Sequence, residues 1–362
     1  MSLRTILVTA ALVLMGVAAS TYAPAQVAPK AASPTLGNTL RFVGGFPGRP
    51  EDLVQVPGTD WIIASSFAGL KTPKTFNGRL VLINAKTRTY SKVAINQADV
   101  ARAPYAACPA PPDPARFSAH GLNIRRKANG HSTLFVVGHL GREAIEVFDV
   151  AITPGKPLLT WIGCVPAIDG AFYNSVVGLP DGRILTTDFL HAGATMADLF
   201  ANKKTGAVYI WKPGGAWEKL AGTDLSGPNG IEVSADQGFL FVADSGTPTV
   251  FRYDMNATDK APEAIKPGFR TDNIRWASDG RLLFAGTKPD PKCQPPGLTC
   301  PVTLFVKAFD PNTGALTTLF DAPAGPTFPN LSSALIVNGI LWLGSPDVNR
   351  VAYMELPGDG RP

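Results

Sequence analysis

The sequence has little charge for its length. Only 17% of its 362 residues are charged, and the formal net charge of +5 is spread without a dense run of lysine or arginine. It therefore shows no nucleic-acid signature beyond a mildly basic composition. A coiled coil is excluded because it needs a charged, glycine-poor helical repeat. A disordered chain is excluded because 45% of the residues are hydrophobic.

Several motifs of well-known enzyme classes are also missing. There is no Gly-x-Ser-x-Gly elbow, which disfavours a serine hydrolase. There is no GxGxxG dinucleotide loop and no P-loop. No CxxC pair occurs and no histidine lies close to a cysteine in sequence, which disfavours a zinc site.

The first residues predict a secretory signal over residues 1–25. An arginine precedes an uncharged, mostly apolar run at 6–19, and a small-x-small cleavage pattern follows at 23–25. The run is short for a transmembrane helix, although an uncleaved anchor is the alternative. We therefore expect a periplasmic or secreted protein with no membrane span after signal removal. Residues 26–38 would be a disordered lead-in, and 39–362 a single domain.

Glycine and proline are abundant, with 36 and 33 residues, as expected for short strands joined by tight turns. An apolar strand after a turn rich in Gly, Asp or Asn recurs six times, and an outer hairpin follows each copy. The period of about 56 residues predicts an all-β, six-bladed β-propeller. The inner copies are 62–66, 134–138, 184–188, 240–244, 282–286 and 340–344. A strand at 39–43 could close the ring with the last blade, and one short helix is expected over 194–202.

The innermost strand of each predicted blade begins with polar residues that would face the central channel. They are Glu51-Asp52, His120-Gly121, Asn174-Ser175, Asn229-Gly230, Asp272-Asn273 and Ser332-Ser333. One such residue alone is more often part of a turn, but six blades place one at matching positions. Two carboxylates and three amide oxygens that converge on one point match the hard ligands of Ca²⁺. The pattern therefore predicts a calcium site on the axis.

Four cysteines allow three pairings, and export would make disulfide bonds possible. Cys293 and Cys300 flank a six-residue loop and are expected to bond locally. Cys108 and Cys164 lie at nearly equal offsets before His120 and Asn174. We therefore expect these two to join inter-blade loops over the calcium funnel.

With these residues in view, the chain resembles the paraoxonase family of calcium-dependent lactonases and arylesterases, within the senescence-marker/gluconolactonase propellers. The likeness covers roughly residues 45–356 and depends on the order and spacing of short segments. They are Glu51-Asp52-Leu53, Phe117-x-x-His120-Gly121, Val136-Val137-Gly138-His139, Asn174 with Thr187-Asp188, Asn229-Gly230-Ile231, and Asp272-Asn273-Ile274.

The resemblance implies roles for individual residues. It implies that His120 and His139 form a dyad that activates water. It implies a second calcium at Asp52 and Leu122, although Ser175 stands where the family often has an Asp. It also implies that a catalytic calcium is held by Glu51, Asn174, Asn229, Asp272 and Asn273.

The expected function is hydrolysis of a small-molecule lactone or aryl ester at this calcium, with His120 as general base. Activation of water by the metal itself is an alternative. Apolar residues in the 188–206 insertion would form a lid or substrate pocket, or would pack against the blade. These are Phe189, Leu190, Met196, Leu199 and Phe200. A gluconolactonase-type sugar lactonase and a non-catalytic, calcium-stabilised binding propeller are the rival interpretations.

Overall fold

The structure is a computed structural model that describes residues 40–69, 76–77, 79–97, 101–257, 259–293, 300 and 302–357. The predicted signal at 1–25 and the lead-in at 26–38 lie outside the described residues. Within the described part of the chain, no helix is both long and apolar enough to cross a membrane. The strands all belong to one unit formed by residues 33–362.

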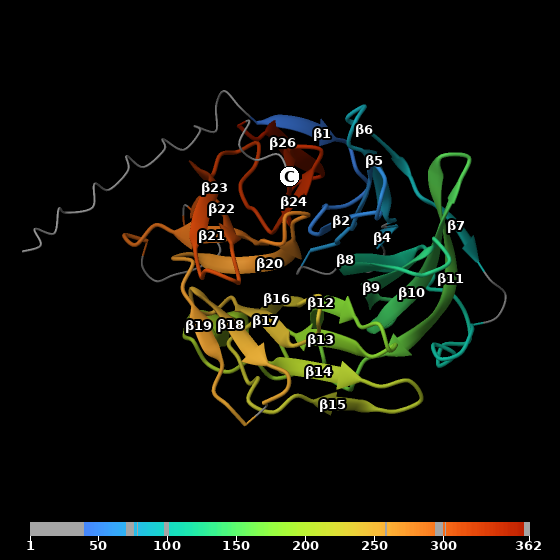
Figure 1. The fold of residues 1–362 in the computed structure, drawn as a ribbon, viewed down its shortest axis with the longest axis horizontal. Coiled ribbons are helices and arrows are strands. Elements are labelled where there is room, and N and C mark those ends of the chain that lie inside the picture. The colour runs from blue at the N-terminus through green and yellow to red at the C-terminus, as the bar shows by residue number, and fades with distance from the viewer. Residues whose placement is uncertain are drawn as a thin grey trace, which may run out of the picture. The chain divides into compact units, whose positions relative to one another are not determined.

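The described strands form six sheets set around a common axis, as the repeat predicted (Figure 1). Blade 1 consists of β2 (Leu53–Gln55), β3 (Trp61–Ala64), β5 (Val81–Asn84) and β6 (Thr89–Lys92). Blade 2 has β8 (Arg116–Arg126), β9 (Ser132–Leu140), β10 (Ala144–Thr153) and β11 (Lys156–Pro166). Two short strands extend blade 2 in parallel at its edges, β4 (Phe76–Asn77) beside β8 and β7 (Ala94–Gln97) beside β11.

The remaining blades have four strands each. Blade 3 consists of β12 (Tyr173–Gly178), β13 (Ile184–Asp188), β14 (Ala207–Trp211) and β15 (Trp217–Lys219). Blade 4 has β16 (Pro228–Val233), β17 (Phe239–Asp244), β18 (Thr249–Asp254) and β19 (Glu263–Ile265). Blade 5 has β20 (Arg270–Trp276), β21 (Leu282–Pro289), β22 (Val302–Phe309) and β23 (Leu316–Pro323). Blade 6 has β24 (Ser333–Val337), β25 (Ile340–Gly344), β26 (Arg350–Glu355) and β1 (Arg41–Gly44).

The first strand of each blade lies nearest the axis (Figure 1). Contacts run from β2 to β8, β12, β16, β20 and β24 in turn, and from β24 back to β2. The inner strands therefore form a closed ring, and residues far apart in sequence meet at its centre.

The predicted turns have the backbone that hairpins require. β24 and β25 are joined by Asn338 and Gly339 alone, with φ of 54° and 74°. Two consecutive positive φ angles are the mark of a type I′ turn, whose twist matches that of the strands. Asn and Gly are the residues that tolerate this backbone best.

The hydrophobic core is divided among the blade interfaces. The described residues form six buried clusters, and each cluster is contributed by two neighbouring blades. Between blades 2 and 3, for example, Phe135 and Val147 pack with Tyr173 and Trp211. Burial of apolar surface between sheets thus supports the ring, and the axis is left for polar groups.

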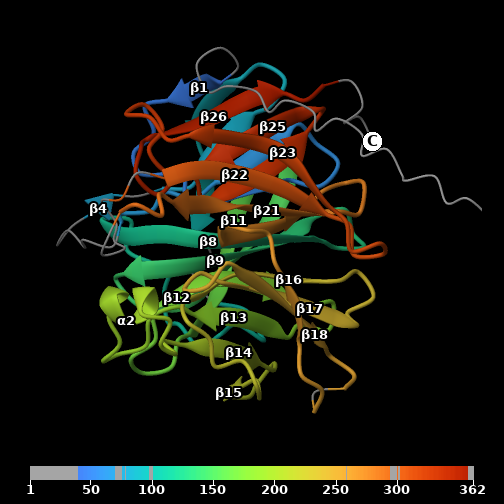
Figure 2. The ribbon, with the colours of Figure 1, turned by 90° about the vertical axis from the view of Figure 1, so that its left-hand side faces the viewer.

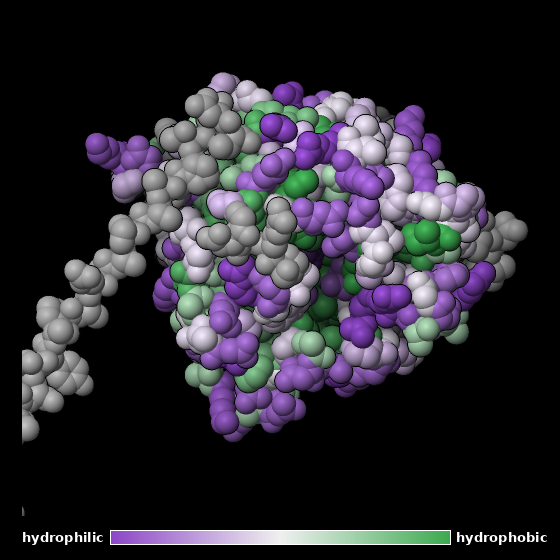
Figure 3. Space-filling view, turned by 45° about the horizontal axis from the view of Figure 1, so that its top comes forward, coloured by the Kyte–Doolittle hydropathy of each residue, from purple (hydrophilic) through white to green (hydrophobic). Residues whose placement is uncertain are grey.

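The helix in the long insertion is shorter than predicted. α2 spans Met196–Phe200, and Thr195 caps its N-terminus by accepting a hydrogen bond from the Asp198 backbone. Figure 2 shows α2 at one end of the strands of blade 3. Most of the face drawn in Figure 3 is polar, with hydrophobic groups in a hollow near its middle.

Both expected disulfide pairs, Cys108–Cys164 and Cys293–Cys300, are formed. The expected position of Cys164 was wrong, however, because it lies within β11, the outer strand of the four-stranded part of blade 2, and not in an inter-blade loop. Ala106 forms a bridge with Cys164. The bond therefore fastens the segment before β8 to its own blade, and neither cysteine lines the large cavity described below.

Closure of the ring rests on an N-terminal strand, as predicted. β1 pairs antiparallel with β26, with Val43 opposite Val351. Val43 is buried in the cluster between blades 6 and 1, together with Trp342. The first described strand therefore completes the last blade.

We expect Val43→Ala to lower the free energy of unfolding by about 2 kcal/mol, because it removes two buried methyl groups from this closure. Arg41→Ala on the same strand is the matched control, since Arg41 is exposed. Urea unfolding of both variants would measure the difference. Equal losses in the two variants would show that closure does not depend on burial at Val43.

Candidate functional site

Breaks in strand pairing position the polar residues of the inner strands. The register shifts between Ala119 and Leu122 in β8 and between Tyr173 and Val176 in β12. Similar shifts occur in β16 and β20. Such irregularities re-aim side chains that a regular strand would alternate between its faces. They coincide with the four residue pairs His120-Gly121, Asn174-Ser175, Asn229-Gly230 and Asp272-Asn273.

Two glycines in these pairs allow neighbouring blades to approach each other. A Cβ atom at Gly121 would overlap the backbone of Asn174, and one at Gly230 would lie 2.5 Å from the backbone nitrogen of Ile274. His120-Gly121 and Asn229-Gly230 therefore combine a polar side chain with the close packing that brings it to the axis.

Four buried oxygen atoms among the expected calcium ligands have no hydrogen-bond partner. They are Oε2 of Glu51 and the Oδ1 atoms of Asn174, Asn229 and Asn273. The Asn273 Nδ2 group donates to Glu51 Oε1 at 2.7 Å, and the Asn229 side chain bonds to Asp272. The amide nitrogens thus face carboxylates while the amide oxygens stay free. Since buried acceptors are normally satisfied, this set has the chemistry of a hard-cation site.

The charge of the cluster leads to the same conclusion. Burial raises the pKa of Glu51 well above its ordinary value, and the nearby Asp272 and Asp52 raise it further. Burial also raises the pKa of Asp272 to about 7. Arg275 offsets the charge of Glu51 only in part, and a divalent cation would supply the remaining counter-charge for both carboxylates. The described residues contain no group of three or more His, Cys, Asp or Glu side chains placed to hold a metal, so this set depends on its amide oxygens.

His120 and His139 belong to a longer hydrogen-bonded chain. His139 Nδ1 lies 2.7 Å from Glu143 Oε2, and His139 Nε2 lies 3.0 Å from His120 Nδ1. His120 Nε2 lies 3.6 Å from Glu51 Oε2. Phe67 stacks on His120 with ring centroids 4.0 Å apart, which fixes the orientation of the imidazole.

Glu143 determines which nitrogens of this chain carry protons. A carboxylate only accepts, so His139 donates from Nδ1 and accepts at Nε2. His120 must then donate from Nδ1, which leaves its Nε2 unprotonated beside Glu51. Burial lowers the pKa of His120 well below its ordinary value, and the nearby His139 lowers it further. A backbone hydrogen bond with Tyr173 opposes this shift. The lowered pKa favours the neutral imidazole, and in the tautomer with the proton on Nδ1 the Nε2 lone pair can accept a proton.

The sequence analysis missed Glu143. The Glu143 carboxylate also accepts a hydrogen bond from the backbone of Tyr173 at 2.9 Å, so it joins blades 2 and 3. Its only signal in the sequence is its place four residues after His139, just before β10. That signal becomes meaningful only when the pairing of β9 with β10 is known.

At Asp52 and Leu122, where a second calcium ion was expected, the structure has a network of hydrogen bonds. The Leu122 backbone nitrogen donates to Asp52 Oδ2 at 2.7 Å. The guanidinium of Arg275 bonds both to Asp52 and to the Leu122 carbonyl oxygen. A protein cation therefore stands where the resemblance implied a metal ion.

A cavity of about 740 Å³ opens above these groups. Four of the five predicted pocket residues line it, namely Phe189, Met196, Leu199 and Phe200, whereas Leu190 does not. Of the expected metal and dyad residues, Glu51, His120, Asn174, Asn229 and Asp272 line the cavity, and Asn273 and His139 do not. The polar set and the apolar wall thus share one space.

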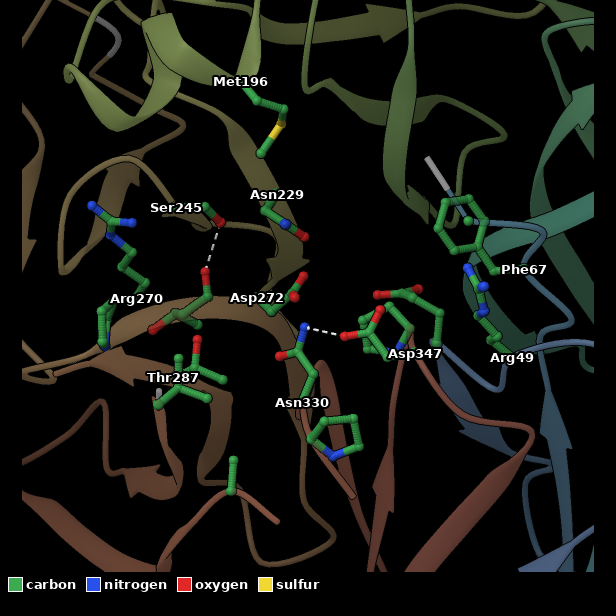
Figure 4. Close-up of a pocket in the computed structure, with 18 of the residues that line it drawn as sticks. Arg49, Phe67, Met196, Asn229, Ser245, Arg270, Asp272, Thr287, Asn330 and Asp347 are labelled. Carbon is green, nitrogen blue, oxygen red and sulfur yellow. Dashed lines mark hydrogen bonds between the residues drawn. The ribbon is translucent and has the colours of Figure 1, made fainter. Parts of the chain in front are cut away.

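Two arginines also line the cavity. In Figure 4, Asn229 and Asp272 lie near the middle of the view, with Arg270 on one side and Phe67 and Arg49 on the other. The Arg270 guanidinium lies over the Phe200 ring, 5.1 Å from its centroid. The wall of the cavity is therefore mixed in character.

One family model is similar to the middle of the chain. Residues 169–327 match the model of the SMP-30/gluconolactonase/LRE-like region. This segment covers blades 3 to 5 and includes Asn174, Asn229, Asp272 and Asn273, but not Glu51 or the two histidines. No curated protein matches the chain.

Solved structures support the fold. A gluconolactonase from Xanthomonas campestris is 17% identical over 89% of this chain and 91% of its own, with a TM-score of 0.52. A luciferin-regenerating enzyme is 13% identical over 87% and 93%, with a TM-score of 0.53. A putative gluconolactonase is 17% identical over 90% and 94%, with a TM-score of 0.51. At these identities the likeness establishes the six-bladed propeller alone.

The raised pKa of Asp272 predicts how the metal-free protein responds to pH. The pKa moves from an ordinary 3.8 in the unfolded chain to about 7 in the folded state. The folded state then binds this proton more tightly, so the contribution of Asp272 to stability is lost as the pH rises from about 4 to about 7. In chelator, Asp272→Asn should therefore gain stability relative to the unmodified protein across this range.

Urea unfolding of both proteins at several pH values would measure this difference. Comparing the two proteins cancels the contributions of groups that do not interact with Asp272, including His120, whose lowered pKa acts in the opposite direction. Glu51 does interact with Asp272, and the fall of its pKa in the variant adds to the difference in the same direction. A difference that does not change with pH would contradict the burial of an uncompensated carboxylate at Asp272.

Proposed function

We propose that this protein is an exported, calcium-dependent hydrolase of the paraoxonase type that cleaves lactones or aryl esters. The main support is one observation: unpartnered ligand oxygens, an unprotonated imidazole nitrogen and an apolar wall lie around the same cavity. Export is proposed from residues 1–25 of the sequence.

Glu51, Asn174, Asn229, Asp272 and Asn273 would hold the calcium ion. When bound, Ca²⁺ would polarise the carbonyl group of the substrate and stabilise negative charge on its oxygen. The free oxygens and raised carboxylate pKa values of these residues fit such an ion. The amide nitrogens of Asn229 and Asn273 would keep the two carboxylates in place.

His120 would act as the general base. Its Nε2 atom lies 3.6 Å from Glu51 Oε2, both residues line the cavity, and an unprotonated Nε2 can accept a proton from water. The positive charge that then forms on His120 would be balanced through His139 by the carboxylate of Glu143. Phe67 and Phe172 stack on the two imidazoles and would hold them in line.

The apolar wall would receive the organic part of the substrate. Phe189 and Leu199 are buried, and Met196 and Phe200 complete the wall. This part of the wall favours an aliphatic or aromatic group over a sugar, because sugar hydroxyls would lose their hydrogen bonds to water there, whereas Arg49 and Arg270 line other parts of the cavity.

A gluconolactonase-type sugar lactonase is the second candidate. It is favoured by the family match at residues 169–327 and by the gluconolactonases among the similar structures. The chain of Glu143, His139 and His120 and the hydrophobic wall favour the first candidate.

Loss of a calcium ligand should lower calcium binding and activity together. We expect Glu51→Gln to lower calcium affinity and hydrolysis together, because carboxylate charge dominates Ca²⁺ binding. Elemental analysis and a panel of aliphatic lactones, sugar lactones and aryl esters would measure both effects. Full activity in metal-free protein would refute the proposal, hydrolysis of sugar lactones alone would support the second candidate, and calcium binding without hydrolysis would indicate a binding propeller.

The histidine chain should affect turnover without affecting the metal. We expect His120→Gln to lower kcat by about 10²–10⁴-fold with calcium still bound, as is typical when a general base is lost. His139→Gln and Glu143→Gln should cost less, since both residues act through His120.

His131→Gln is the matched control for these substitutions. His131 lies outside the cavity and pairs with Asp149 at 2.7 Å, so its loss should leave kcat unchanged. Wild-type turnover in His120→Gln would exclude this residue as the base.

A further inference from the structure

Arg275 is a buried cation that joins four blades at the axis. It belongs to β20 in blade 5, and only 4% of its surface is exposed. Its Nε group donates to the Leu53 carbonyl oxygen of blade 1 at 3.1 Å, and Nη1 donates to Glu232 of blade 4 at 2.9 Å. Its Nη2 group bonds to Asp52 of blade 1 and to the Leu122 carbonyl oxygen of blade 2.

The groups around this guanidinium are all oxygen atoms. Two carboxylates, Asp52 and Glu232, and the carbonyls of Leu53 and Leu122 converge on one position from three other blades. The Ile274 carbonyl of its own strand also accepts from Nη1, at 3.4 Å. Asp52 is fully buried and Glu232 is 6% exposed, so neither carboxylate is solvated by bulk water. Oxygen ligands of this kind would also suit a Ca²⁺ ion, with water completing its coordination.

The place of Arg275 in sequence links it to the proposed metal site above. Arg275 follows Asn273 by two residues, and Asp52 follows Glu51 directly. The Arg275–Asp52 pair therefore joins the two segments that supply Glu51 and Asn273, whose side chains bond each other at 2.7 Å.

We infer that Arg275 takes the place of a second, structural calcium ion and acts as a permanent internal cation. A divalent ion and a guanidinium would repel each other at this position, so the residues present do not fit a second metal. Ser175 agrees with this, because its hydroxyl supplies no negative charge where the family often has an Asp. A tethered cation cannot be removed by a chelator.

This inference deepens the proposed function, but its test is independent of it. Arg275→Ala should leave a cavity lined by Asp52, Glu232 and the two carbonyl groups. The variant should therefore bind one more Ca²⁺ ion per chain than the unmodified protein. It should also gain thermal stability as calcium is raised into the millimolar range.

Equilibrium dialysis with elemental analysis, together with melting curves in calcium and in chelator, would measure both effects. Arg275→Lys keeps a cation and should bind no additional ion. Arg275→Ala combined with Asp52→Asn should lose the additional ion again. Unmodified protein that binds no calcium would refute the proposed function, and the comparison between variant and parent would still decide this inference.

Two results would overturn the inference. One is an Arg275→Ala protein that binds no more calcium than its parent. The other is a variant that fails to fold even when it is refolded in calcium, because an external cation should then replace the lost guanidinium. Folding of the variant only in calcium would support the inference.

Discussion

Everything at the centre of this ring depends on the burial of oxygen atoms without enough protons to satisfy them. Glu51, Asn174, Asn229 and Asn273 each have a buried oxygen that accepts no hydrogen bond. Such atoms cost free energy unless a cation or donor compensates them. The six apolar clusters between the blades offset this free-energy cost by burying hydrophobic surface. They lie apart from the axis, so the polar atoms there do not interrupt them. Stability and reactivity therefore reside in different layers of each blade.

Arg275 and the proposed calcium ion would compensate these oxygen atoms at two different depths. At the deeper position the guanidinium of Arg275 is part of the chain and binds Asp52 and Glu232. At the position that borders the cavity, no lysine or arginine side chain pairs with Glu51 or Asp272 among the described residues. A substrate must reach a polarising charge directly, which a side chain bonded on all sides cannot offer. For this reason the proposed calcium ion would suit the upper position, while a covalent cation occupies the lower.

The sequence predicted the parts of the site that repeat from blade to blade. Glu51, His120, Asn174, Asn229 and Asp272 were found because each precedes or enters an inner strand at a matching position, and closure by the first strand followed from the same count. Glu143, Glu232 and Arg275 break this rule. Glu143 reaches His139 through the β9–β10 turn, and Arg275 meets Asp52 across the ring, so their contacts appear only once strand register and blade order are known. Cys164 was misplaced for a related reason, since the length of β11 was not predictable.

The residues that line the cavity come from two different parts of the chain, the inner strands and the 188–206 insertion. The expected metal ligands and His120 lie in or beside inner strands, where irregular pairing and close packing restrict their movement. The apolar wall comes instead from the 188–206 insertion, a capped turn of helix between β13 and β14. An insertion of this kind can change its side chains without altering the register of any blade, because it contributes no strand to the sheet. Under the proposed function, the residues that distinguish an aliphatic or aryl substrate from a sugar are therefore to be sought in this insertion, and those that would perform the reaction in the strands beneath it.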